Sequence, residues 1–132
     1  MASHFDKVKN YLSELGFKIA SENAKQEWVV VNDEANGIKH LIVDCEAPIV
    51  VLTQYLFDIK NADGKILKRL LQMNNSLVHG AFVLDENGKR LLFKDTLELE
   101  NLDRNELEGS IKALSLALVE HGSELIKFAK GN

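Results

Sequence analysis

The stretch GAFVLDENGKRLLFK, residues 80–94, decides the fold. On both sides of its centre, the side chains alternate with the period of a β-strand. Phe82 and Leu84 share one apolar face before the centre, and Leu91 and Phe93 share one after it. Between the flanks lies Glu86–Lys89, and its Asn-Gly dipeptide favours a tight turn. The stretch therefore predicts a β-hairpin, and the sequence on either side of it predicts what covers the resulting sheet.

A long helix is expected after the hairpin, starting at Asp103 or just after it. Asp103 is a suitable N-cap, and Glu106 three residues later completes a capping box. Apolar positions then follow steps of four and three residues: Leu107, Ile111, Leu114, Leu118, His121, Leu125 and Phe128. A helix of up to about 27 residues would be about 40 Å long and should cross the whole domain. Gly109 and Gly122 are the expected places for a bend or for close packing.

A second helix is expected before the hairpin, from Ala62 or Asp63 to Asn75, with Asn74-Asn75 capping its end. Its apolar residues cover an arc of roughly 160°, wider than a one-sided surface helix needs: Ile66, Leu67, Leu70, Leu71 and Met73. Deep burial against the sheet explains this arc, and so does contact of part of it with another subunit. The linker Ser76–Gly80 joins this helix to the hairpin.

The N-terminal part predicts one helix and then strands. The helix spans Ser3–Leu15 and stops at Gly16. The candidate strands are Phe17–Glu22, Glu27–Asn32, Ile38–Cys45 and Ile49–Asp58. Asn36-Gly37 predicts a tight hairpin, and Pro48 a break before the fourth strand. That strand is apolar on both faces near its start, which is typical of a central strand or of a strand covered on both faces. The third is less cleanly amphipathic, with Lys39 and Asp44 on opposite faces.

The order α-β-β-β(-β)-α-β-β-α contains no βαβ alternation and no internal repeat. The expected class is therefore α+β, an antiparallel sheet flanked by helices, in one domain that spans residues 1–132.

Composition excludes several classes of protein. Sixteen basic and twenty acidic residues give a net charge of −4, which argues against a nucleic-acid partner. No apolar run approaches the roughly 18 residues that span a bilayer, so no membrane partner is expected. The N-terminus shows no secretory signal, and one cysteine, Cys45, suits a reducing cytoplasm.

Catalytic and metal-binding motifs are absent from the sequence: it has no P-loop, G-x-G-x-x-G, H-E-x-x-H, G-x-S-x-G or C-x-x-C. The four histidines fall in four different elements: His4, His40, His79 and His121. His79 fits a solvated loop or the lining of a groove, and His121 a buried neutral side chain or a pH-sensitive interface contact. Cys45 fits a small buried hydrophobe. We therefore expect no enzyme activity, no cofactor and no metal.

Two charge clusters fit either a solvated surface or the steering of a partner. The acidic cluster comprises Asp95, Glu98, Glu100, Asp103, Glu106 and Glu108, and the basic one Lys65, Lys68 and Arg69.

The sequence resembles the YbjN-like proteins, which belong with the type III secretion chaperone-like superfamily and its Tir-chaperone (CesT) group. Leucines, Asn, Gly and Asp at particular positions carry the resemblance: Leu70–Asn75, Gly80–Asp85, Asn87-Gly88, Leu91–Asp95 and Leu97 to Leu102-Asp103. The resemblance spans nearly the whole chain in element order. It implies a small acidic bacterial cytosolic protein that dimerises and holds a partner polypeptide, such as a secreted effector, without ATP.

Two functional hypotheses follow. The first is a homodimeric protein-binding domain whose partner or dimer surface includes the apolar arc of the second helix and exposed parts of the fourth strand: Ile66, Leu67, Leu70, Leu71, Met73, Val50, Leu52 and Tyr55. Extended peptides bind sheet edges and apolar grooves through main-chain hydrogen bonds and side-chain pockets. The alternative is an enzyme, or a small-ligand or regulatory protein, with a groove near His79, Tyr55 and Asp95.

Overall fold

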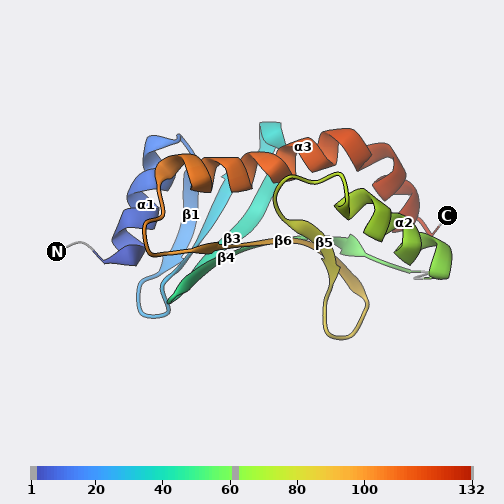
Figure 1. The fold of residues 1–132 in the computed structure, drawn as a ribbon, viewed down its shortest axis with the longest axis horizontal. Coiled ribbons are helices and arrows are strands. Elements are labelled where there is room, and N and C mark those ends of the chain that lie inside the picture. The colour runs from blue at the N-terminus through green and yellow to red at the C-terminus, as the bar shows by residue number, and fades with distance from the viewer. Residues whose placement is uncertain (1–2, 61–62, 132) are drawn as a thin grey trace.

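The computed structural model describes residues 3–60 and 63–131 and has the predicted α+β architecture (Figure 1). The elements follow the predicted order: α1 (His4–Glu14), β1 (Lys18–Asn23), β2 (Trp28–Asp33), the 3₁₀ turn η1 (Glu34–Asn36), β3 (Ile38–Glu46), β4 (Ile49–Asp58), α2 (Gly64–Asn74), β5 (Ala81–Leu84), β6 (Arg90–Glu98) and α3 (Arg104–Ala129). The optional additional strand of the prediction is present as β1.

The strands form one antiparallel sheet in the order β1-β2-β3-β4-β6-β5. β4 is central, as its two-sided apolar start predicted, and it pairs with β6 along its whole length, from Ile49 opposite Glu98 to Asp58 opposite Arg90. The chain passes from β4 through α2 to β5 and returns through the hairpin, which places β6 inside the sheet and β5 at its edge. The edges of the sheet are therefore β1 and β5.

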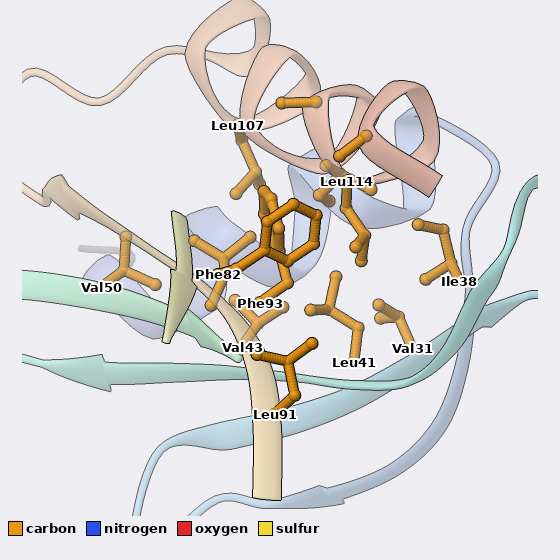
Figure 2. Packing of buried hydrophobic residues seen from close by; sticks show 14 of the residues in the cluster. Val31, Ile38, Leu41, Val43, Val50, Phe82, Leu91, Phe93, Leu107 and Leu114 are labelled. Carbon is orange, nitrogen blue, oxygen red and sulfur yellow. The ribbon is translucent and has the colours of Figure 1, made fainter. Parts of the chain in front are cut away.

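The hydrophobic core lies between one face of the sheet and the helices. Figure 1 shows α3 lying along the length of the molecule, with α1 at one end and α2 at the other. In Figure 2, Leu107 and Leu114 of α3 point toward the sheet residues Phe82, Phe93 and Leu41. Because side chains alternate along a strand, the intervening residues project from the other face of the sheet. None of the helices α1, α2 and α3 of the described chain covers that face (Figure 1).

Predicted helix starts are confirmed by their caps. The side chains of Ser3, Asp63 and Asp103 each accept a hydrogen bond from the backbone three residues on, and Asp103 with Glu106 forms the full capping box. The alternative start of α2 at Ala62 lies outside the described residues. α3 has 26 residues, and its C-terminal turns curve toward α2 (Figure 1).

Close packing requires neither glycine of α3. A Cβ at Gly109 would lie 3.8 Å from the His79 ring, which is an ordinary van der Waals contact. A Cβ at Gly122 would meet nothing within 4 Å, so close packing does not explain that glycine.

A hairpin joins β2 and β3 at Asn36-Gly37, as predicted, but its turn is longer than the tight one predicted, because the pairing resumes with Asp33 opposite Ile38. Glu34–Asn36 form a 3₁₀ turn that ends at Gly37, whose φ is 78° and whose N–H donates to Glu34 O at 3.1 Å. A two-residue type I′ turn needs positive φ at both central positions, and Gly37 alone supplies it here.

A β-bulge explains the irregular pattern of the third strand. Leu41 pairs with Val31 and Ile38 with Asp33, so Lys39 and His40 together oppose a single residue. His40 has a φ of 55°, and its N–H donates to Asn32 Oδ1. The additional residue lets Ile38 and Leu41 both face the core.

The side chain of Gln54 forms hydrogen bonds with the backbone beside this bulge. Its side chain is 3% exposed and lies where the β3–β4 ladder ends. Oε1 accepts from Lys39 N at 3.0 Å, and Nε2 donates to Gly37 O at 3.0 Å. One side-chain amide thereby satisfies two backbone groups that lie beyond the end of the β3–β4 ladder.

Candidate protein-binding surface

The polar residues of the family-like stretch stabilise the fold. Asn75 is the C-cap residue of α2, as predicted, but the Asn74 side chain does not cap the helix. Its Oδ1 accepts from Phe82 N at 2.7 Å, and its Nδ2 donates to Phe82 O at 3.1 Å. Asn74 therefore ties the end of α2 to the outer edge of β5.

Gly80 and Asp85 shape the hairpin. Gly80 has a φ of 74°, and a Cβ there would overlap the Phe93 ring. The Asp85 carboxylate accepts from the N–H groups of Lys89 and Arg90 at 2.9 and 3.1 Å, and these bonds lower its pKa, that from Arg90 most. The turn also differs from the two-residue type that Asn-Gly favours, because Gly88 N–H donates to Asp85 O and Gly88 alone has positive φ. Gly80 and Asp85 therefore have a structural role in the hairpin.

The alternative site near His79, Tyr55 and Asp95 is not assembled. Asp95 faces the helices, where its Oδ2 accepts from Ser110 Oγ at 2.6 Å, and His79 lies beside Gly109 on the same side. Tyr55 alternates with the buried Gln54 and projects from the opposite, helix-free face. Its hydroxyl donates to Asp58 at 2.8 Å and its ring lies under Arg90. The three residues thus do not line one groove.

The remaining histidine and cysteine sites have structural surroundings. His121 Nε2 lies 3.3 Å from Ser76 Oγ, and its ring packs edge-on against Phe82. Cys45 is a free, buried cysteine, as predicted, and burial together with Glu27 and Asp44 raises its pKa to about 12. Within residues 3–60 and 63–131, no group of His, Cys, Asp and Glu side chains could hold a metal ion. No helix in this part of the chain is long and apolar enough to cross a membrane.

Most of the residues predicted for partner or dimer contact lie in the core of this chain. Five are buried: Ile66, Leu70, Met73, Val50 and Leu52. Leu67 is half-buried, whereas Leu71 is 71% exposed and Tyr55 is exposed on the helix-free face. The α2 arc is wider than one buried face because Leu71 points away from the sheet. The part of the predicted set that a partner can reach is therefore Leu67, Leu71 and Tyr55.

The charge clusters are partly used within the chain. Arg69 pairs with Glu124 at 2.8 Å, and Glu108 with Lys112 at 3.3 Å. Asp95 and the Asp103–Glu106 box serve the fold as described above. Lys65, Lys68, Glu98 and Glu100 remain exposed.

Three highly exposed large apolar side chains flank a groove between α3 and the α2–β5 linker. Val78 is 86% exposed, and across the groove Leu116 and Val119 are 67% and 84% exposed. The groove has a volume of about 410 Å³, and its lining is mostly apolar, with Leu77, Ala113 and Ala117 at its base. We name Val78, Leu116 and Val119 the linker–α3 patch. Such a surface removes apolar area from water when a partner covers it.

Two further hollows accompany this groove. One, of about 470 Å³, lies between the end of β4 and the C-terminal half of α3 and includes Leu56, Phe57 and Ile126. The other, of about 420 Å³, lies on the helix-free face and includes Ile42, Tyr55 and Leu92. The molecule therefore offers apolar hollows for binding and no convergent set of catalytic groups among the described residues.

A family model, CesT_Tir_1, matches residues 1–131. The chain belongs to the CesT_Tir_1 family. The chaperone-like resemblance predicted from residues 70–103 is thereby confirmed.

Solved structures share the fold of this CesT_Tir_1 chain. YbjN from E. coli, described as a proposed transcription regulator, superposes with a TM-score of 0.70 at 14% identity, covering 92% of both chains. A chain of the HopA1–SchA chaperone–effector complex superposes with a TM-score of 0.61 at 13% identity, covering 86% of this chain and 90% of that one. No curated protein sequence matches the chain. At these identities the structures establish the shared α+β fold.

Sequence reasoning missed the linker–α3 patch in this CesT_Tir_1 chain. Val78 falls in a stretch treated only as a linker. The apolar steps that mark the buried side of α3 include Leu114 and Leu118. Leu116 and Val119 are not part of these steps and are exposed. Large apolar residues off the buried stripe of an amphipathic helix were the available signal.

Proposed function

We propose that this chain is a non-catalytic, chaperone-like protein that binds a partner polypeptide in the bacterial cytoplasm and works as a homodimer. The partner that best fits the family is a secreted effector held in an extended form. The observation that carries the proposal is the linker–α3 patch, three large apolar side chains exposed beside a groove. Membership of the CesT_Tir_1 family supports the chaperone-like role.

The groove suits an extended apolar segment better than a small molecule. It lies along the junction of α3 and the linker, and Glu120 is the only charged residue among the described residues that line it. An extended segment that places alternate apolar side chains between Val78 and Leu116 would cover both at once. Loss of this contact should weaken binding without unfolding the protein, because these side chains are exposed.

The sheet edges are poor alternatives for strand addition. β5 has four residues, and Asn74 already occupies Phe82 N–H and C=O at its outer edge. β1 carries a bulge between Ile19 and Ser21 and the charged side chains Lys18 and Glu22. Bulges, charges and short length are the devices that blunt an edge strand. This makes side-chain burial in the groove the main source of affinity.

Native mass spectrometry of the protein purified gently from its own cells tests the function. The wild type should carry a stoichiometric polypeptide, and V78E/V119E should lose it. The matched control is N105E, which adds a charge to the same helix about 21 Å from Val119 along the axis. A wild type without any polypeptide contradicts the function, whereas equal loading of V78E/V119E contradicts only the surface.

A further inference from the structure

The basic residues of α2 form one surface with the last turns of α3. Arg69 Nε donates to both carboxylate oxygens of Glu124, at 2.8 and 3.1 Å, and Figure 1 shows α2 lying beside the C-terminal turns of α3. Lys127 follows Glu124 by three residues and is therefore its neighbour on the helix. Lys65 and Lys68 are exposed on α2, and Lys127 is exposed on α3. We name Lys65, Lys68, Arg69 and Lys127 the α2–α3 basic surface.

The charge of this region contrasts with that of the rest of the chain. Residues 60–75 and 123–132 contain six basic and two acidic residues, whereas the other residues include ten basic and eighteen acidic ones. The side chains of Lys65, Lys68 and Lys127 form no ion pair with another described residue. Three cationic side chains are thus available to an anionic partner.

The stability of α2 does not explain its lysines. α1 and α3 carry Asp6 and Glu106 in their first turns, whereas the first turn of α2 has no acidic residue and has Lys65 as its second residue. The N-terminal end of a helix carries a partial positive charge, so a cation there is unfavourable. An anionic partner would offset this repulsion.

One side of α3 connects the linker–α3 patch with the basic surface. Leu116, Glu120, Ser123 and Lys127 follow one another at steps of four, three and four residues, so they lie along the same side of the helix. Val119 and Lys127 are separated by about 12 Å along the axis. An extended polypeptide covers that distance in about four residues. A segment seated on the patch can therefore reach the lysines.

The two glutamates on the way differ in their surroundings. Glu124 is neutralised by Arg69, with an N–O distance of 2.8 Å. Glu120 lines the groove, and its side chain is exposed, 3.7 Å from His121 Nε2. Because like charges repel, an acidic side chain is disfavoured next to Glu120 and favoured next to Lys65 and Lys127. The pattern separates an apolar part of the partner from an acidic part.

We propose that the partner segment combines apolar side chains, which occupy the linker–α3 patch, with acidic side chains about four residues away, which occupy the α2–α3 basic surface. Burial of the apolar side chains supplies affinity, and the opposite charges supply selectivity and faster encounter. The inference names the chemistry of the polypeptide in the proposed function and rests on that function.

Three labelled peptides test this preference. Each carries four leucines that alternate with serines, then a three-residue glycine–serine spacer, then four glutamates, four glutamines or four lysines. Fluorescence anisotropy at low salt gives the dissociation constants with the full chain. The glutamate peptide should bind about tenfold tighter than the glutamine peptide, and the lysine peptide should bind most weakly. Added salt should reduce these differences.

The variant K65E/K68E should lose the preference for the glutamate peptide. Its matched control is K18E/K25E, which changes the net charge equally at exposed lysines that form no ion pair with another described residue. The control should keep the preference. Because glutamate suits a helix N-terminus, K65E/K68E should melt no lower than the wild type, which separates lost binding from unfolding. V78E/V119E should weaken the binding of the uncharged glutamine peptide.

Several outcomes overturn the inference. Equal affinity of the wild type for the three peptides contradicts it, as does binding of none of them at millimolar concentration. A preference that survives in K65E/K68E contradicts the assigned lysines. Tighter binding of a twelve-nucleotide oligothymidylate than of the glutamate peptide assigns the surface to nucleic acid instead. Native mass spectrometry keeps the two proposals apart: a cellular polypeptide on the wild type leaves the proposed function standing when the peptide preference is absent.

Discussion

The side-chain amide of Asn74 forms two hydrogen bonds with the backbone of Phe82, one as acceptor and one as donor. Asp85 N–H donates to Arg90 O, so by alternation the backbone groups of Phe82 point away from β6 toward the outer edge. Asn74 therefore occupies the position that a neighbouring strand would take. The end of α2 closes the edge of the sheet that it packs beside.

Replacing Asn74 with Leu should destabilise the protein by about 2–3 kcal/mol, because both Phe82 groups lose their partner in a partly buried position. Chemical denaturation measures the loss. Asn75→Leu is the control, since Asn75 is exposed and its side chain forms no hydrogen bond with another described residue. Equal stability of the two variants would show that the Asn74–Phe82 pair contributes nothing.

Gly80→Ala should be far more damaging than Gly88→Ala. Both glycines have positive φ, near 70°, which costs an alanine about 1–2 kcal/mol. At Gly88 a Cβ meets open space, whereas at Gly80 it overlaps the Phe93 ring and should cost about 1–3 kcal/mol more. Thermal unfolding of the two variants gives the comparison. Similar melting temperatures would mean that the ring of Phe93 moves aside freely.

Asp85 should make folding sensitive to acid. Backbone N–H groups lower its pKa in the folded state, the Arg90 N–H most, so its ionised form stabilises the fold. That contribution is present above the unfolded pKa, about 3.9, and is lost as the pH falls through the lower folded value. Asp85→Asn should be less stable than the wild type at pH 7 and match it more closely at low pH. Denaturation at several pH values tests this, with Glu86→Gln in the same turn as control.

Cys45 should be inert toward thiol reagents in the folded protein. It is 6% exposed, and burial holds its pKa at about 12, so little thiolate exists at neutral pH. Modification by a disulfide reagent should wait for unfolding or local opening. Cys45→Ser/Ser123→Cys, with its thiol on an exposed position of α3, should react orders of magnitude faster. Comparable native rates would show that β3 opens readily.

Sequence signals that act within a few residues predicted the helices and strands most accurately. The capping box at Asp103 and the apolar steps after Leu107 placed α3, because cap and periodicity act within a few residues. The bounds of β4, Ile49–Asp58, were predicted for the same reason. The bulge at His40 was not predicted, since it depends on pairing with β2 and on the distant side chain of Gln54.

The binding surface was harder to predict than the fold. Apolar periodicity does not distinguish a residue that packs against its own sheet from one that waits for a partner, so Ile66 and Leu71 looked alike in sequence. Tyr55, His79 and Asp95 come from three elements, and the strand alternation that separates Tyr55 from the other two depends on the register of β4. The role of Asn74 likewise required the position of β5.

The residues between Leu70 and Asp103 that carry the family resemblance serve the fold. Asn74 closes an edge, Gly80 leaves room for a ring, and Asp95 fastens a strand to α3. The surface that would select a client lies on other residues, such as Val78 and Val119. A protein of this family could therefore exchange one client for another by altering a few exposed side chains while the family motif stayed unchanged. The motif identifies the fold, and the exposed side chains select the client.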